Sequence, residues 1–147
     1  MLRVYTGDVS SLENGKLFER FYDIVSAERQ KKIDALRFDS DRRLSLGAEL
    51  LLKKATEDAG YRYQTLHKSL SEKGKPFFDN LPGFCFNLSH SGTMAMCAVS
   101  DRDTGCDVEK ITGSNLKIAK RFSFTISSNM SFSSSGKHLK NMLTQTV

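Results

Sequence analysis

The sequence lacks any long hydrophobic run. Its longest aliphatic stretch is Leu50–Leu52, whereas a membrane-spanning helix needs about 20 predominantly apolar residues. The stretch Met1–Tyr5 also lacks the long apolar segment of a signal peptide. These absences argue against an integral membrane protein and against a secreted one, and we expect a soluble protein with no membrane partner.

Cysteine is scarce, and its spacing fits neither a disulfide framework nor a metal site. The three cysteines, Cys85, Cys97 and Cys106, stand in apolar company without a Cys-x-x-Cys pair. An odd number in such contexts is typical of reduced core residues. We therefore expect free thiols and a cytoplasmic protein.

Acidic residues are fewer than basic ones. The 147-residue chain has 22 Lys and Arg against 17 Asp and Glu, a formal net charge of +5. This excess favours an anionic partner, such as a nucleotide, an acidic protein or a nucleic acid, without choosing among them. No basic patch interleaved with aromatics and no known nucleic-acid motif is present, so we expect no nucleic-acid partner.

The composition changes abruptly after Phe122. Residues 123–147 contain seven serines and no Asp or Glu, and no helical or strand period continues through them. Such a composition is typical of a poorly ordered segment. We expect an N-terminal domain of residues 1–122 and a divergent Ser-rich tail of residues 123–147.

Hydrophobic periodicity predicts a layered α+β or α/β fold with an antiparallel component in its sheet, and we favour α+β. The predicted strands are 2–8, 84–88, 94–99 and a pair within 66–78, and the predicted helices begin at Ser10 or Ser11, at Ser26, at Asp39 and at Asn115.

The best predicted helix is Asp39–Ala59, which Gly60 ends. Gly47 inside it costs about 1 kcal/mol relative to Ala. It indicates close packing against a neighbour or a ligand passing nearby, and a tolerated surface glycine is the alternative.

Two carboxylates flank Val108 in a short apolar run that is typical of a strand edge. Asp107 and Glu109 then point to one face, roughly 6.5–7 Å apart, because side chains alternate along a strand. They repel each other unless a cation lies between them, and Mg²⁺ would leave positions open for phosphate oxygens. A solvated strand end is the common alternative for an isolated Asp-x-Glu pair.

Two further motifs carry groups that bind phosphate. Ser89 and His90 follow an apolar run, and we expect them in the turn that ends this strand, where both can contact a phosphate. Gly74-Lys75-Pro76 holds a lysine on a rigid turn, because proline restricts the residue before it. Each motif alone is an ordinary turn, but with the carboxylate pair they predict a site for a phosphate ester bound with a metal.

The order of these motifs resembles the 4'-phosphopantetheinyl transferases of the surfactin synthetase-activating type. The resemblance is carried by Gly74-Lys75-Pro76, Phe86-Asn87-Leu88-Ser89-His90-Ser91-Gly92 and Gly105-Cys106-Asp107-Val108-Glu109-Lys110, with Arg43-Leu44-Ser45-Leu46-Gly47 upstream and Ile118-Ala119-Lys120-Arg121-Phe122 downstream. It covers about residues 1–122. It implies the N-terminal half of a pseudo-two-fold fold, with an antiparallel sheet and packed helices.

The resemblance implies a Mg²⁺-dependent transferase that acts in nonribosomal peptide or fatty acid biosynthesis. Such an enzyme moves the 4'-phosphopantetheine group of coenzyme A to a serine of an acyl or peptidyl carrier protein. Asp107 and Glu109 would bind the metal and form the catalytic set with His90. The residues implied in binding coenzyme A are Arg29, Lys32, Arg43, Gly74, Lys75, Pro76, Ser89 and His90. A solvated helix face is the alternative for Arg29 and Lys32.

One part of the family pattern is missing. The family continues through a second half with a Trp-x-x-Lys-Glu-Ser-x-x-Lys-like helix, whose glutamate completes the metal site. This sequence has no Trp and no Glu after Glu109. We therefore hypothesise a truncated or frameshifted transferase, and the alternative function is a non-catalytic module that binds coenzyme A or a carrier protein. The intact family is monomeric, whereas the face left open here would permit a dimer.

Overall fold

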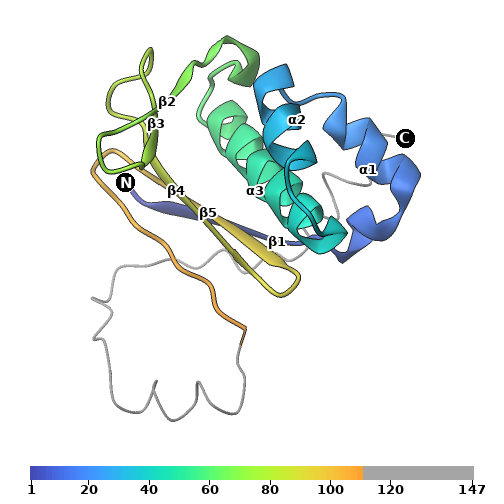
Figure 1. Cartoon of the computed structure of the whole chain (residues 1–147). Coiled ribbons are helices and arrows are strands. Elements are labelled where there is room, and N and C mark those ends of the chain that lie inside the picture. Colours follow the sequence, from blue (N-terminus) through green and yellow to red (C-terminus); the bar gives the residue numbers. More distant parts are fainter. Residues whose placement is uncertain (111–147) are drawn as a thin grey trace, which may run out of the picture.

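Helices cover one face of an antiparallel sheet in the computed structural model, which describes residues 1–110 (Figure 1). The strands are β1 Arg3–Asp8, β2 Lys68–Leu70, β3 Pro76–Phe78, β4 Cys85–Ser91 and β5 Met94–Ser100; the helices are α1 Gly15–Tyr22, α2 Ala27–Asp34 and α3 Asp39–Asp58, with 3-10 turns η1 Ser10–Glu13 and η2 Tyr63–Thr65. The predicted α+β class is confirmed. The predicted boundary at residue 122, the helix from Asn115 and the tail 123–147 lie outside the described residues.

The main sheet has the order β1-β5-β4, and both pairings are antiparallel. β4 and β5 form a hairpin in which Phe86 pairs with Val99 and Ser91 with Met94. The turn between them contains Gly92, whose positive φ of 63° suits a glycine. β2 and β3 form a separate two-stranded sheet. All the strands predicted within the first 100 residues are thereby confirmed.

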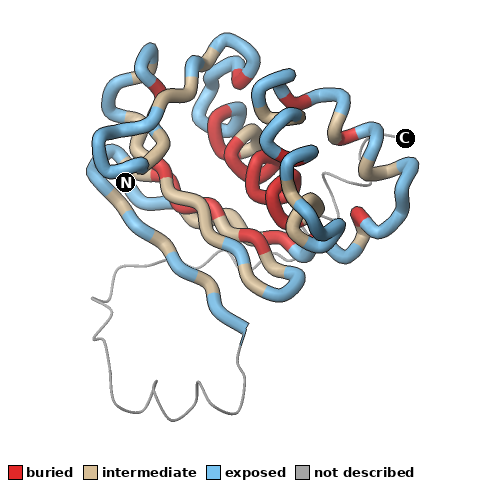
Figure 2. The backbone as a smooth tube through the Cα atoms, viewed as in Figure 1, coloured by how far each residue is buried: buried red, intermediate tan, exposed pale blue. Residues whose placement is uncertain are grey.

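Helix α3 is the centre of the core. Every residue from Leu44 to Leu52 is buried, so this part of the helix is covered around its whole circumference (Figure 2). The sheet covers one side with Phe86, Cys97 and Val99, and α1 and α2 pack on the other. Burial raises the pKa of the Cys97 thiol, and all three cysteines are free.

Among the glycines of residues 1–110, Gly47 has the closest neighbour. A Cβ built there would lie 2.3 Å from Cγ1 of Val9, a distance that real side chains do not adopt. The interpretation of Gly47 as a close-packing position is therefore confirmed. None of the helices in residues 1–110 is both long and apolar enough to cross a membrane.

The helix starts agree with the sequence at α2 and at α3, which begins at Asp39 as predicted, and differ at α1. Ser26 caps α2, as predicted, by accepting a hydrogen bond from the Arg29 amide at 3.2 Å. The helix expected from Ser10 or Ser11 is instead divided into η1 and α1, and Asn14 caps α1 through the Leu17 amide. The predicted serine cap is wrong because the asparagine is the better-placed acceptor immediately before α1.

The contact at Gly47 gives a stability prediction. Gly47→Ala should lower the free energy of unfolding by about 1–2 kcal/mol, because overpacking against buried Val9 outweighs the gain in helix propensity. Urea unfolding measures this change. Gly15→Ala is the control, since no described atom lies within 4 Å of its added Cβ. In the double variant with Val9→Ala the two losses should be less than additive; a Gly47→Ala protein as stable as the wild type would contradict the contact.

Candidate functional site

The sequence motifs meet where the chain leaves β5 and returns along β4. We call residues 103–110 the carboxylate segment. Figure 1 shows it in orange, passing below the sheet on the side away from α3. Asn87, Ser89 and Ser91 alternate with the core residues Phe86 and Leu88 along β4, so they point to that same side.

Side chains of β4 hold the carboxylate segment through its backbone. Three amides of the segment donate to three alternate side chains of the strand: Cys106 to Asn87 Oδ1 at 2.8 Å, Val108 to Ser89 Oγ at 3.0 Å and Lys110 to Ser91 Oγ at 3.0 Å. The predicted strand edge is corrected accordingly, since residues 103–110 form no backbone ladder with β4. The segment is held instead by side-chain acceptors, which satisfy three of its amides.

The predicted alternation of the carboxylate segment is present. Cys106 and Val108 are half-buried, whereas Asp107 and Glu109 are both exposed. Ser89 also donates from its hydroxyl to Asp107 Oδ1 at 3.1 Å. The Ser89 hydroxyl therefore accepts one hydrogen bond and donates another, and it fixes the side chain of Asp107 as well as the backbone next to it.

The Gly-Lys-Pro turn holds the start of the carboxylate segment. Lys75 donates from Nζ to the carboxylate of Asp103 and, at 2.6 Å, to the carbonyl oxygen of Thr104. The hydrogen bond and charge of Lys75 lower the pKa of Asp103. Gly74 has a φ of 76°, and Pro76 begins β3. This turn thus directs its lysine to the carboxylate segment.

His90 lies in β4 and not in the turn that follows it. It pairs with Ala95 in the hairpin, and the turn begins only at Gly92. The predicted turn position is wrong because the strand continues through the polar residues Ser89, His90 and Ser91, whose backbone pairs with β5. His90 is exposed and, by alternation, lies on the opposite face of β4 from Ser89.

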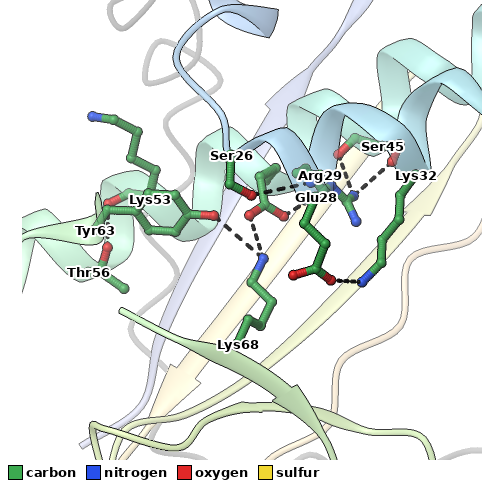
Figure 3. A network of polar contacts seen from close by, with 10 residues as sticks. Ser26, Glu28, Arg29, Lys32, Ser45, Lys53, Thr56, Tyr63 and Lys68 are labelled. Atoms are coloured by element: carbon green, nitrogen blue, oxygen red, sulfur yellow. Dashed lines mark hydrogen bonds and ion pairs between the residues drawn. The ribbon is translucent and has the colours of Figure 1, made fainter. Parts of the chain in front are cut away.

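The three predicted basic contacts differ in their surroundings. Arg29 Nη2 donates to the carbonyl oxygen and the hydroxyl of Ser45 at 2.8 and 2.7 Å, so its guanidinium is engaged inside the protein (Figure 3). Lys32 forms an exposed ion pair with Glu28 at 2.7 Å. The hydrogen bond and charge of Lys32 lower the pKa of Glu28.

Arg43 is the third predicted basic contact and forms a longer ion pair. Its Nη2 lies 3.8 Å from Oε1 of Glu13, an exposed carboxylate. The surroundings of these residues show that Arg29 does not belong to a solvated helix face, whereas Lys32 keeps an exposed ammonium.

Sequence reasoning missed the buried carboxylate of Glu49. This side chain is 1% exposed, and it pairs with Arg29 Nε at 3.2 Å and with the ammonium of Lys68. The contact with Arg29 is an ion pair without hydrogen-bond direction, so neither Arg29 Nε nor Glu49 Oε2 has a hydrogen-bond partner in residues 1–110. The available signal was a lone Glu inside the apolar run Leu46–Leu52.

Lys68 and Glu49 line a cleft of about 510 Å³ between α2, η2 and the β2–β3 sheet. Figure 3 shows Lys68 reaching toward the hydroxyl of Tyr63, 3.5 Å away. Burial lowers the pKa of Lys68, and the charge of Glu49 partly opposes this effect. The pair joins α3 to β2.

The carboxylate segment offers two oxygen ligands for a hard cation. Asp107 and Glu109 lie on its exposed side, which leaves room for further ligands. No group of three or more His, Cys, Asp and Glu side chains in the described part of the chain could hold a metal ion. The two carboxylates therefore fit part of a Mg²⁺ site, with the other positions open.

The buried ion pairs predict a large effect at Glu49. Glu49→Gln should lower the free energy of unfolding by about 2–3 kcal/mol, because it leaves Arg29 and Lys68 without their counter-charge. The side chains of Arg29 and Lys68 are 21% and 24% exposed, so water partly solvates their charges. The loss of stability should therefore be smaller than for a fully buried pair. Glu57→Gln, which breaks only a surface pair with Lys53, should cost about 0.5 kcal/mol or less. Urea unfolding compares the two, and equal losses would contradict the role of Glu49.

The lowered pKa of Lys68 predicts a pH dependence. The unfolded chain holds this proton more tightly, so stability rises as pH increases from the folded pKa toward the ordinary value of 10.5. Removing the Glu49 charge lowers the pKa of Lys68 further, so the stability difference between Glu49→Gln and wild type should shrink as the pH rises toward 10.5. Unfolding free energies across this range measure it. In a Lys68→Met background the difference should not change with pH.

Comparison with known proteins finds relatives over most of the described residues. A family model described as "4'-phosphopantetheinyl transferase, N-terminal" matches residues 14–102. A 4'-phosphopantetheinyl transferase of Bacillus subtilis is 34% identical over 105 residues, covering 71% of this chain and 47% of the relative. The transferase Sfp of Bacillus subtilis strain 168 is 33% identical over 108 residues, with the same coverage. The transferase psf-1 of Bacillus pumilus is 33% identical over 108 residues, covering 73% and 46%.

The match includes most of the folded elements. It runs from the cap of α1 through the end of β5, and the carboxylate segment follows directly. The chain spans about half the length of the curated relatives it matches. By the family match and these relatives, the chain belongs to the 4'-phosphopantetheinyl transferase family.

Proposed function

We propose that this chain acts in the transfer of 4'-phosphopantetheine from coenzyme A to a serine of an acyl or peptidyl carrier protein. The observation that carries the proposal is the carboxylate segment, which presents Asp107 and Glu109 together on its exposed side. Family membership supplies the reaction class. The described residues supply a fixed pair of carboxylates beside an edge strand with an exposed histidine.

In this reaction the carrier-protein serine attacks the pantetheine-side phosphorus, and adenosine 3',5'-bisphosphate leaves. Asp107 and Glu109 would hold Mg²⁺, which neutralises charge on the pyrophosphate when bound. Asp107 is oriented for this by the Ser89 hydroxyl. His90 lies on the opposite face of β4 from Ser89, but β4 is an edge strand, and we propose that the exposed imidazole donates to a phosphate oxygen that extends past this edge.

We propose different parts for the remaining residues. Within residues 1–110, Lys32 and Arg43 form ion pairs with exposed carboxylates, so their charges remain available to the phosphates of coenzyme A. Arg29 and Lys75 already donate to protein acceptors, and they support the site by holding α2 and the carboxylate segment. Gly74 and Pro76 shape the turn that presents Lys75.

A net charge of +5 suits an acidic carrier protein as the partner. Free thiols suit the cytoplasm. We also propose that two copies of the chain form a dimer through the face that meets the second half in the intact family. Sedimentation equilibrium of the purified chain tests this.

A binding module without transferase activity is the second candidate. This candidate is favoured because residues 1–110 contain no group of three or more side chains that could bind a metal ion. Such a module would bind coenzyme A or the carrier protein and leave the carrier unmodified. Titration calorimetry with coenzyme A separates binding from turnover.

The first experiment is the intact mass of an apo carrier protein after incubation with the chain, coenzyme A and Mg²⁺. We expect a mass gain of one phosphopantetheine group. Asp107→Asn and Glu109→Gln should each slow the reaction by about 100-fold or more, since each removes charge that holds the metal. A full-length relative serves as the positive control. If only the relative modifies the carrier while this chain still binds coenzyme A, the binding module replaces the transferase.

A further inference from the structure

We propose that Asn87 and Ser91 are positioning residues, which hold the Asp107–Glu109 pair in register over β4 without touching either carboxylate. The proposal rests on the function proposed above for that pair. The anchoring of the carboxylate segment is independent of that function, because three hydrogen bonds show it directly.

The anchoring repeats at a constant interval. Donor and acceptor are 19 residues apart at each of the three hydrogen bonds, so segment and strand run parallel and advance at the same rate. Every second amide of the segment is held. A slip by one residue would turn Asp107 and Glu109 toward the sheet and Cys106 and Val108 toward solvent. The three bonds therefore determine which face carries the carboxylates.

Asn87 and Ser91 bracket the pair from its two ends. Asn87 binds the amide one residue before Asp107, and Ser91 binds the amide one residue after Glu109. Ser89 lies between them and holds Asp107 directly. Loss of Asn87 would remove the anchor of the amide before Asp107, and loss of Ser91 would remove that of the amide after Glu109, so each loss should loosen one carboxylate. Groups that orient metal ligands are typically worth 10–100-fold in metal affinity.

The strand that carries Asn87 and Ser91 is itself held in place. β4 pairs with β5 from Cys85 to Ser91, so the acceptor side chains stand on a continuous hairpin. Gly92 follows, and a Cβ there would lie 3.4 Å from the Lys110 side chain, which shows that the stem of Lys110 packs over this glycine. At the other end Lys75 holds Asp103 and Thr104.

The test is amide hydrogen exchange by NMR on the full chain, combined with titration of Mn²⁺ as a paramagnetic probe. Asn87→Ala and Ser91→Ala are the test variants, and Ser91→Thr keeps a hydroxyl acceptor as a conservative rescue. Asn80→Ala is the matched control, because Asn80 also binds backbone groups through its side chain, at His67 and Thr65, away from the carboxylates.

In the wild type, the amides of Cys106, Val108 and Lys110 should exchange about tenfold or more slowly than those of Asp107 and Glu109. Asn87→Ala should remove the protection of Cys106, and Ser91→Ala that of Lys110. Each should raise the Mn²⁺ concentration needed to broaden the Asp107 and Glu109 signals by about tenfold. Asn80→Ala and Ser91→Thr should stay close to the wild type in both measurements.

Two results would overturn the proposal while the transferase function stands. One is uniform exchange along the wild-type segment. The other is an unchanged Mn²⁺ midpoint in Asn87→Ala and Ser91→Ala after protection has been lost. If Mn²⁺ broadens neither carboxylate signal in the wild type, the positioning role fails together with the metal site. Transfer to the carrier protein is then decided by the mass measurement alone.

Discussion

The burial of α3 around its whole circumference is the constraint on which the other elements depend. A helix with no exposed face between Leu44 and Leu52 needs a sheet on one side and helices on the other. The contact of Gly47 with Val9 brings α3 close to the chain that follows β1, and Ala95 on β5 lies beside the same glycine. Since β4 pairs with β5, this packing also sets the position of the strand that carries the candidate site.

A buried charge complicates that core. Glu49 projects from the middle of the apolar stretch of α3, and Arg29 from α2 and Lys68 from β2 meet it there. A buried ion pair is weak support for net stability, because desolvation opposes the attraction. What the two ion pairs do here is join α2 and β2 to α3. Arg29, which the family pattern suggests as a phosphate contact, thus takes part in the internal structure through Ser45 and Glu49.

Local patterns predicted those features of the fold that depend on local chemistry. Alternation predicted β4 and β5, helical spacing predicted α3, and the serine before α2 predicted its cap. Local patterns do not predict hydrogen bonds and ion pairs between residues that are distant in the sequence. Asn87 gave no sign that it would accept from the Cys106 amide, and His90 was placed in a turn because polar residues are common there. The apolar surroundings of Glu49 were a visible signal, but its counter-ions come from two other elements.

The parallel course of the carboxylate segment along β4 has a consequence for chain length. The path from Asn87 to Cys106 goes out along β4, back along β5 and then returns beside β4. Lengthening both strands of the hairpin by one residue, with the turn and residues 101–105 unchanged, raises the separation of 19 residues by two. The three hydrogen bonds then persist only if all of them shift by the same amount. A related sequence can therefore carry a longer or shorter hairpin and keep both carboxylates outward if the separation of donor and acceptor stays the same at all three bonds, whatever its value.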